Sequence, residues 1–85
     1  MPETKIGVIT HHFGKIGVAV IKATETELSV GDTIHIKGHT TDYTQVVESM
    51  EIEHQQIQKL KKGEEAGLKV TDKVHENDEV FKVTD

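Results

Sequence analysis

The chain has 85 residues, a formal net charge of −5, ten basic side chains that are all lysine, and no cysteine. These values exclude disulfides and thiolate metal sites, and they argue against autonomous nucleic-acid binding, because arginine makes most bidentate phosphate and base contacts. No apolar run approaches the roughly 20 residues that cross a bilayer, and no signal-peptide pattern opens the chain, so we expect a cytoplasmic protein.

The size and the apolar composition favour a single β domain. The apolar residues are mostly valine and isoleucine, aromatic residues are few, and tryptophan is absent. Such β-branched side chains suit the interior of a small barrel better than a helical bundle. We therefore expect a polar tail over residues 1–4 and one β-barrel domain over residues 5–85.

The first third of the chain predicts two strands. Residues 5–10 alternate in apolar character and form the first, and residues 11–15 connect it to the next, with Gly14 as the turn residue. Residues 16–21 are apolar on both faces, which indicates a strand that is central or covered on both sides.

The middle of the chain is less regular. Residues 43–54 form the longest β-like stretch, with Met50 and Ile52 pointing inward, and the blurred phase at residues 47–49 predicts a bulge. Residues 55–62 have apolar side chains only at two positions, a spacing that permits one helical turn.

One short pattern occurs three times, in residues 28–36, 60–68 and 74–83. Each copy has an apolar residue, two spacers, a turn residue with an acid, and then alternating apolar residues. The turn residues are Gly31, Gly63 and Asn77, which tolerate positive φ, so each copy predicts a tight turn that launches a strand. Six or seven short strands then predict an all-β fold, a small closed antiparallel barrel, because closure removes exposed edges.

Catalytic motifs are missing from the sequence. There is no phosphate-binding glycine loop, and neither serine lies in a nucleophile elbow. Glu51 and Glu53 share a strand face and could act as paired carboxylates, but that chemistry needs a groove that a small barrel rarely supplies, so a solvated face is favoured. We therefore expect no enzymatic activity and no cofactor.

The six histidines are the candidates for metal binding. His35 and His39 have a ligand spacing that is useful on a helix, but a strand end and a glycine separate them here. We therefore expect surface histidines and no metal site. His54 shares its phase with Met50 and Ile52, so we expect a neutral ring at the barrel mouth, hydrogen-bonded to the backbone.

The apolar strand pair at residues 6–20 and the three turn–strand copies occur in an order that resembles the second domain of translational GTPases, the elongation factor Tu-like barrel. Residues 46–52 resemble a "Val-x-Ser-Met" strand of that family. The resemblance covers nearly the whole chain and implies a free-standing "translation elongation factor-like" binding module. A similar barrel occurs in collagenase-like peptidases, which implies an alternative role as an accessory protein–protein subunit of such an enzyme.

We accordingly expect a non-catalytic module that acts with a larger partner in translation or RNA metabolism. A protein partner is favoured, and the acidic, arginine-free composition argues against tRNA or ribosomal RNA. The loop aromatics Phe13 and Tyr43 either stack on a ligand or plug the barrel ends. The predicted binding residues lie in two loops and at one strand end: His12, Phe13, Lys15, His39, Tyr43, Met50 and His54.

Overall fold

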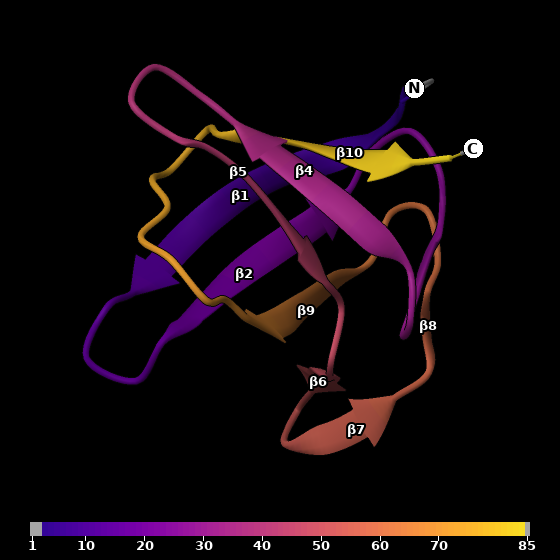
Figure 1. Cartoon of the computed structure of the whole chain (residues 1–85). Coiled ribbons are helices and arrows are strands. Elements are labelled where there is room, and N and C mark those ends of the chain that lie inside the picture. The colour runs from indigo at the N-terminus through magenta and orange to yellow at the C-terminus, as the bar shows by residue number, and fades with distance from the viewer. Residues whose placement is uncertain (1–2, 85) are drawn as a thin grey trace.

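A computed structural model describes residues 3–84, which form ten β-strands (Figure 1). The strands are β1 (Glu3–Phe13), β2 (Val18–Ala23), β3 (Leu28–Ser29), β4 (Thr33–Lys37), β5 (Asp42–Val46), β6 (Met50–Ile52), β7 (Gln55–Ile57), β8 (Lys59–Leu60), β9 (Glu65–Lys69) and β10 (Glu79–Val83). The all-β prediction is confirmed. Within those residues, no helix is long and apolar enough to cross a membrane.

Eight of the strands pair in one antiparallel sheet, in the order β5-β4-β10-β1-β2-β9-β6-β7. β3 and β8 pair separately in a two-stranded sheet. Because β5 and β7 are the two ends of this order, the prediction of a closed barrel is wrong: backbone pairing does not join the two ends. The described part of the chain also has more strands than the six or seven predicted, because segments read as loops form very short strands.

A side chain bridges the gap that the backbone leaves. Gln45 on β5 is 8% exposed, and its Nε2 donates to the carbonyl of Lys69 at 2.8 Å. Its Oε1 accepts from the backbone nitrogen of Thr71 at 2.9 Å and from the Tyr43 hydroxyl at 2.9 Å. The sheet therefore curls until β5 approaches the end of β9, and one buried amide fixes that approach.

The core fills the inside of the curled sheet. Alternation along each strand sends one set of side chains inward, as Ala19, Ile21 and Ala23 of β2 illustrate at 0% exposure. Isoleucine, leucine and valine dominate the interior, as the composition predicts. The largest fully buried side chains are Ile6, Ile9, Ile21, Leu28, Ile34, Ile36, Met50, Leu60, Leu68, Val47, Val74 and Val80.

The three predicted turns are confirmed. Gly31, Gly63 and Asn77 have φ values of 97°, 93° and 72°, and β4, β9 and β10 follow them. In each turn the acid accepts a hydrogen bond from the backbone nitrogen three residues earlier, at 2.8–2.9 Å: Asp32 from Ser29, Glu64 from Lys61 and Asp78 from His75. A positive φ at the third turn position favours glycine or asparagine there. The repeated pattern is thus a repeated turn.

Two boundaries near the first turn differ from the prediction. β1 begins at Glu3, inside the predicted tail, and continues through Phe13, and the tight connection is Gly14–Gly17. The longer strand contains two register shifts, between Lys5 and Gly7 and between Ile9 and His11. These bulges blur the alternation that a sequence reading relies on. Met1, Pro2 and Asp85 lie outside the described residues.

The predicted bulge at residues 47–49 is also wrong. β5 ends at Val46, and the chain crosses to a different position in the sheet before β6 begins at Met50. Val47 exchanges two backbone hydrogen bonds with the Gly31–Asp32 turn, at 2.9 and 2.8 Å, which fixes this crossing. Residues 55–62 contain β7 and β8 in place of the expected helical turn.

Candidate functional site

An apolar hollow of about 450 Å³ opens on the outer face of the sheet. One wall is made by Phe13, Ile16, Val18 and Val20, which come from the end of β1, the connection and β2. The other residues are polar or small: Ser49, Glu51, Glu53, His54, Gly67 and Lys69. Phe13 and Ile16 are 50% and 71% exposed, which is unusual for side chains of this size.

The apolar wall follows from the two-sided apolar pattern of β2. Its inward residues are buried, and Val18 and Val20 alternate with them on the outer face, where they are half-buried. The expectation that β2 is central is correct, since β1 and β9 flank it, but no described element covers its outer face. The outward-facing Val18 and Val20 are therefore left partly exposed to solvent along the wall of the hollow.

The floor of the hollow is open because β9 carries a glycine there. Gly67 pairs with Val20 of β2 and with Glu51 of β6. A Cβ on Gly67 would lie 3.5 Å from Val18 Cγ1, an ordinary van der Waals distance. Any larger side chain at this position would project into the hollow. The absence of a side chain thus creates the space between β2 and β6.

The opposite wall is a tight hairpin. β6 and β7 pair from Met50–Ile57 to Ile52–Gln55, which leaves Glu53 and His54 as the two turn residues, with φ of 50° and 65°. Two consecutive positive φ values define the turn type that matches the twist of a two-residue hairpin. His54 is therefore exposed at a hairpin tip, and the prediction that it follows the inward phase of Met50 is wrong.

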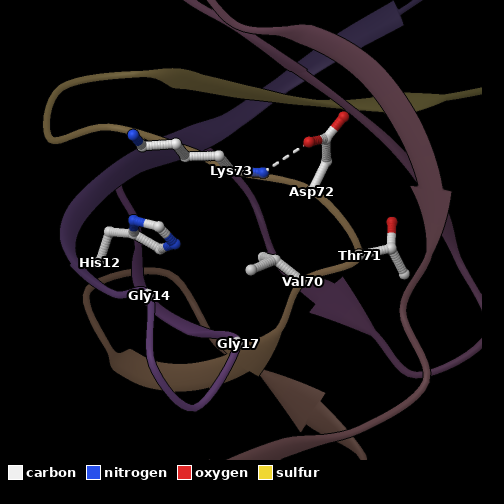
Figure 2. A pocket seen from close by; sticks show the side chains of 7 residues that line it. All are labelled: His12, Gly14, Gly17, Val70, Thr71, Asp72 and Lys73. Atoms are coloured by element: carbon white, nitrogen blue, oxygen red, sulfur yellow. Dashed lines mark hydrogen bonds between the residues drawn. The ribbon is translucent and has the colours of Figure 1, made fainter.

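A second hollow, of about 420 Å³, lies between the β1–β2 connection and the segment that follows β9 (Figure 2). His12, Gly14 and Gly17 line it together with the segment from Val70 to Lys73. Three of the residues that line it, His12, Asp72 and Lys73, have titratable side chains. Asp72 Oδ1 accepts from the Lys73 backbone nitrogen at 2.8 Å, so this carboxylate organises its own loop.

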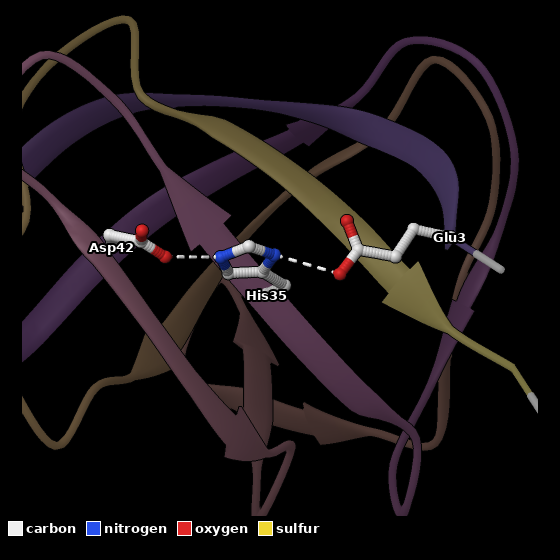
Figure 3. Close-up of polar contacts among 3 residues, drawn as sticks. All are labelled: Glu3, His35 and Asp42. Carbon is white, nitrogen blue, oxygen red and sulfur yellow. Dashed lines mark hydrogen bonds and ion pairs between the residues drawn. The ribbon is translucent and has the colours of Figure 1, made fainter. Parts of the chain in front are cut away.

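His35 on β4 is held between two carboxylates, as Figure 3 shows. Its Nδ1 lies 2.8 Å from Glu3 Oε2 and its Nε2 lies 2.5 Å from Asp42 Oδ1. The hydrogen bond to Asp42, reinforced by the contact with Glu3, raises the pKa of His35 above its ordinary value of 6.5, against the opposing effect of burial. This trio links β1, β4 and β5 across the polar part of the outer face.

Thr41, His75 and Asp78 lie together but do not form a catalytic triad. Thr41 Oγ1 is 3.0 Å from His75 Nδ1, and Asp78 Oδ2 is 3.9 Å from the same nitrogen. A proton relay needs the hydroxyl and the carboxylate on opposite ring nitrogens. The buried Asp78 instead accepts from the His75 backbone nitrogen, so the cluster stabilises the third turn. No group of His, Asp and Glu within residues 3–84 is arranged to hold a metal ion.

The structure distributes the predicted binding residues over several places. Phe13 and His54 line the apolar hollow on the outer face of β2, and His12 lines the second hollow. Lys15 and His39 are exposed in separate loops, and neither residue lines one of the two hollows. The set thus divides between sites, and its assignment to binding stays a prediction.

Two of the predicted binding residues, Met50 and Tyr43, pack in or against the hydrophobic core. Met50 is 0% exposed in the core. Tyr43 packs against the core and donates to Gln45, and its burial raises the pKa of the phenol, which keeps that donor protonated. Tyr43 therefore packs against the core, whereas Phe13 is half exposed, and ligand stacking by Phe13 stays a prediction. Sequence reasoning missed Ile16, Val18, Val20 and Gly67, although the two-sided apolar pattern of β2 was the signal.

Relatives and solved structures place this fold among domains of larger proteins. The chain is 40% identical over 80 residues, 93% of its length, to a protein of Methanocaldococcus jannaschii named as an uncharacterized protease. It is 33% identical over 81 residues, 94% of its length, to a collagenase of Porphyromonas gingivalis. It spans only 19% and 22% of these relatives. No protein-family model matches the chain.

The fold comparison agrees. The crystal structure of the C-terminal domain of a Geobacillus thermoleovorans protein described as a U32 peptidase superposes with a TM-score of 0.86, at 18% identity, over 96% of this chain and 93% of that one. A selenomethionine variant of the same domain gives a TM-score of 0.83 at 16% identity, over 89% and 95% of the two chains.

The expected resemblance to the second domain of translational GTPases is therefore wrong, and so is the role in translation or RNA metabolism that it implied. The relatives are named as a protease and as collagenases, and the superposed domain comes from a protein described as a U32 peptidase. The reason is physical: the motifs that carried the resemblance are tight turns followed by strands, and such turns suit many small β folds.

Proposed function

We propose that this chain is a non-catalytic docking module that packs against a larger protein of the U32 peptidase and collagenase kind. The observation that carries the proposal is the uncovered apolar hollow on the outer face of β2, in a chain whose relatives are about five times longer. Exposed apolar surface that opens onto a preformed hollow is typical of a protein–protein interface. Phe13 and Ile16 are its anchors.

The arrangement of polar side chains within residues 3–84 supports a non-catalytic role. Thr41 and His75 are in contact, but the geometry lacks a relay, as described above. Chemistry would then belong to the larger partner, and this module would hold or orient that partner. A cysteine-free composition supports a reducing compartment such as the cytoplasm.

The test is to insert this chain in place of the matching segment of the M. jannaschii protease. Hydroxyl-radical footprinting then compares Phe13 and Ile16 in the chimera with the same side chains in the isolated 85-residue chain. We expect several-fold slower oxidation of both residues in the chimera, because packing against the larger protein removes them from water.

Val46 provides an internal control, since it is also 50% exposed but does not line the hollow. It should react at the same rate in both proteins. Equal oxidation of Phe13 and Ile16 in a folded chimera and in the isolated chain would contradict the proposal.

A further inference from the structure

The hollow joins an apolar wall to an acidic one. Phe13, Val18 and Val20 line one side, while Glu51 and Glu53 line the other, on β6 and at its hairpin turn. Lys69 is the single lysine among the lining residues. The charge next to the apolar surface is therefore predominantly negative.

These two carboxylates have no partner within the described residues. Elsewhere the same molecule pairs its charges between strands and turns, as in Lys5–Glu79 at 3.0 Å and Lys82–Asp32 at 3.5 Å. The carboxylates of Glu51 and Glu53 make no ion pair or side-chain hydrogen bond with any residue from 3 to 84 whose interactions are described. Covering the hollow with a purely apolar surface would remove water from both without replacing it.

The shape of the hollow sets the apolar part of the partner. Gly67 leaves the floor open between Val20 and Glu51, and the volume of about 450 Å³ suits one or two large aliphatic or aromatic side chains. A side chain that enters here contacts Val20 on one side, and its neighbours reach the carboxylates on the other.

We infer that the partner inserts an apolar side chain flanked by lysine or arginine, so that the cation pairs with Glu51 and Glu53 while the apolar group fills the space above Gly67. This inference rests on the proposed function and adds the chemistry of the partner surface. The occupant is a basic, apolar-anchored segment of the larger peptidase-like protein. The pairing makes docking dependent on salt, because charges at the rim of an interface are screened.

The experiment uses the chimera and reads the oxidation of Phe13. Replacing both carboxylates by lysine (Glu51→Lys with Glu53→Lys) opposes the cation, and we expect the docked fraction to fall about tenfold at low salt. Phe13 then reacts nearly as fast as in the isolated chain. In the parent chimera, raising the sodium chloride concentration should move Phe13 reactivity in the same direction.

A matched control and a filling variant complete the design. Glu76→Lys changes an exposed carboxylate outside the hollow and should leave Phe13 protected. Gly67→Val occupies the hollow with a residue that suits a strand, and Phe13 should become reactive although the domain stays folded. Circular dichroism of each isolated variant checks the fold.

The two proposals fail in different ways. If Phe13 is unprotected in the parent chimera, the docking function itself is wrong. If Phe13 is protected there, and stays protected after both lysine substitutions and at high salt, docking stands and the cationic partner is wrong. Tighter protection in the lysine variant would indicate an acidic partner and would likewise overturn the inference.

Discussion

The outer surface of the sheet has two unlike halves. Around β10, β4 and β5, charged side chains pair across strands, with His35 between Glu3 and Asp42 and with Lys5 on Glu79. Around the first half of β2 the outward residues Val18 and Val20 are apolar and line a hollow. The polar half satisfies its own groups, whereas the apolar half gains from contact with another surface. Whether an exposed residue marks an interface therefore depends on whether neighbouring side chains already satisfy its contacts.

Two strand glycines differ in how closely the neighbouring backbone approaches them, and only Gly67 borders the hollow. A Cβ on Gly7 would lie 1.8 Å from the Lys22 carbonyl oxygen, a backbone atom, whereas Gly67 has only ordinary contacts. We expect Gly7→Ala to lower the free energy of unfolding by more than about 3 kcal/mol, because the strands must separate. Gly67→Ala should be neutral or stabilising by up to about 1 kcal/mol. Urea denaturation measures both, and similar losses would break the distinction.

The two faces of β2 provide the next test. Ile21 points inward at 0% exposure, and its neighbour Val20 points outward into the hollow. Ile21→Ala should cost about 3 kcal/mol of unfolding free energy through the cavity it leaves. Val20→Ala should cost less than about 1 kcal/mol in the isolated chain, because its side chain is only half-buried. An equal cost would mean that the outer face is already packed.

Two of the repeated turns place an acid at the equivalent position, one buried and one exposed. Asp78 is 4% exposed and accepts from the His75 backbone nitrogen, while Glu64 accepts from Lys61 at an exposed site. Asp78→Ala should lower the free energy of unfolding by about 2 kcal/mol, since it removes a buried acceptor and leaves the partly buried His75 backbone donor without a partner. Glu64→Ala should change it by less than about 1 kcal/mol. Thermal unfolding of both variants shows whether burial of the acid, rather than its place in the turn, determines the loss of unfolding free energy.

The smallest effect concerns the polar half. The pKa of His35 is raised above its unfolded value by Asp42 and Glu3, so protonation favours the folded state. This contribution is complete below about pH 6.5 and is lost as the pH rises through the folded pKa. We expect His35→Gln to lower the free energy of unfolding by about 1 kcal/mol or less near pH 6, and by a smaller amount near pH 9. A constant difference across that range would contradict the coupling.

The sequence predicts local structure well and the outer face poorly. Gly31, Gly63 and Asn77 announce their turns because positive φ and the acid that follows are encoded within four residues. The turn at Glu53 and His54 is not announced, since neither residue favours positive φ, and the pairing of β6 with β7 imposes it. The prediction of a closed barrel is wrong for a related reason. The edge strand β5 approaches the end of β9 through the side chain of Gln45, not through backbone pairing, and no sequence pattern indicates such a contact.

The site was only partly predictable for the same reason. Phe13 and His54 were identified as surface candidates, but their shared hollow depends on a glycine in β9 and on a hairpin far along the chain. The residue pattern of β2 shows that both of its faces are apolar, but it does not show which face stays exposed in the folded domain. That answer depends on the order of the strands in the sheet.

Glu3 and Val83 are register partners in β1 and β10, so the start of β1 and the end of β10 lie at the same side of the molecule, away from the β1–β2 connection (Figure 1). Antiparallel partners are separated by only about 5 Å, so a short linker could join them. A circular permutant opened in the exposed loop at residues 38–40 would therefore keep Phe13, Ile16 and the hollow intact. The point at which this module is tethered and the face with which it docks can vary independently.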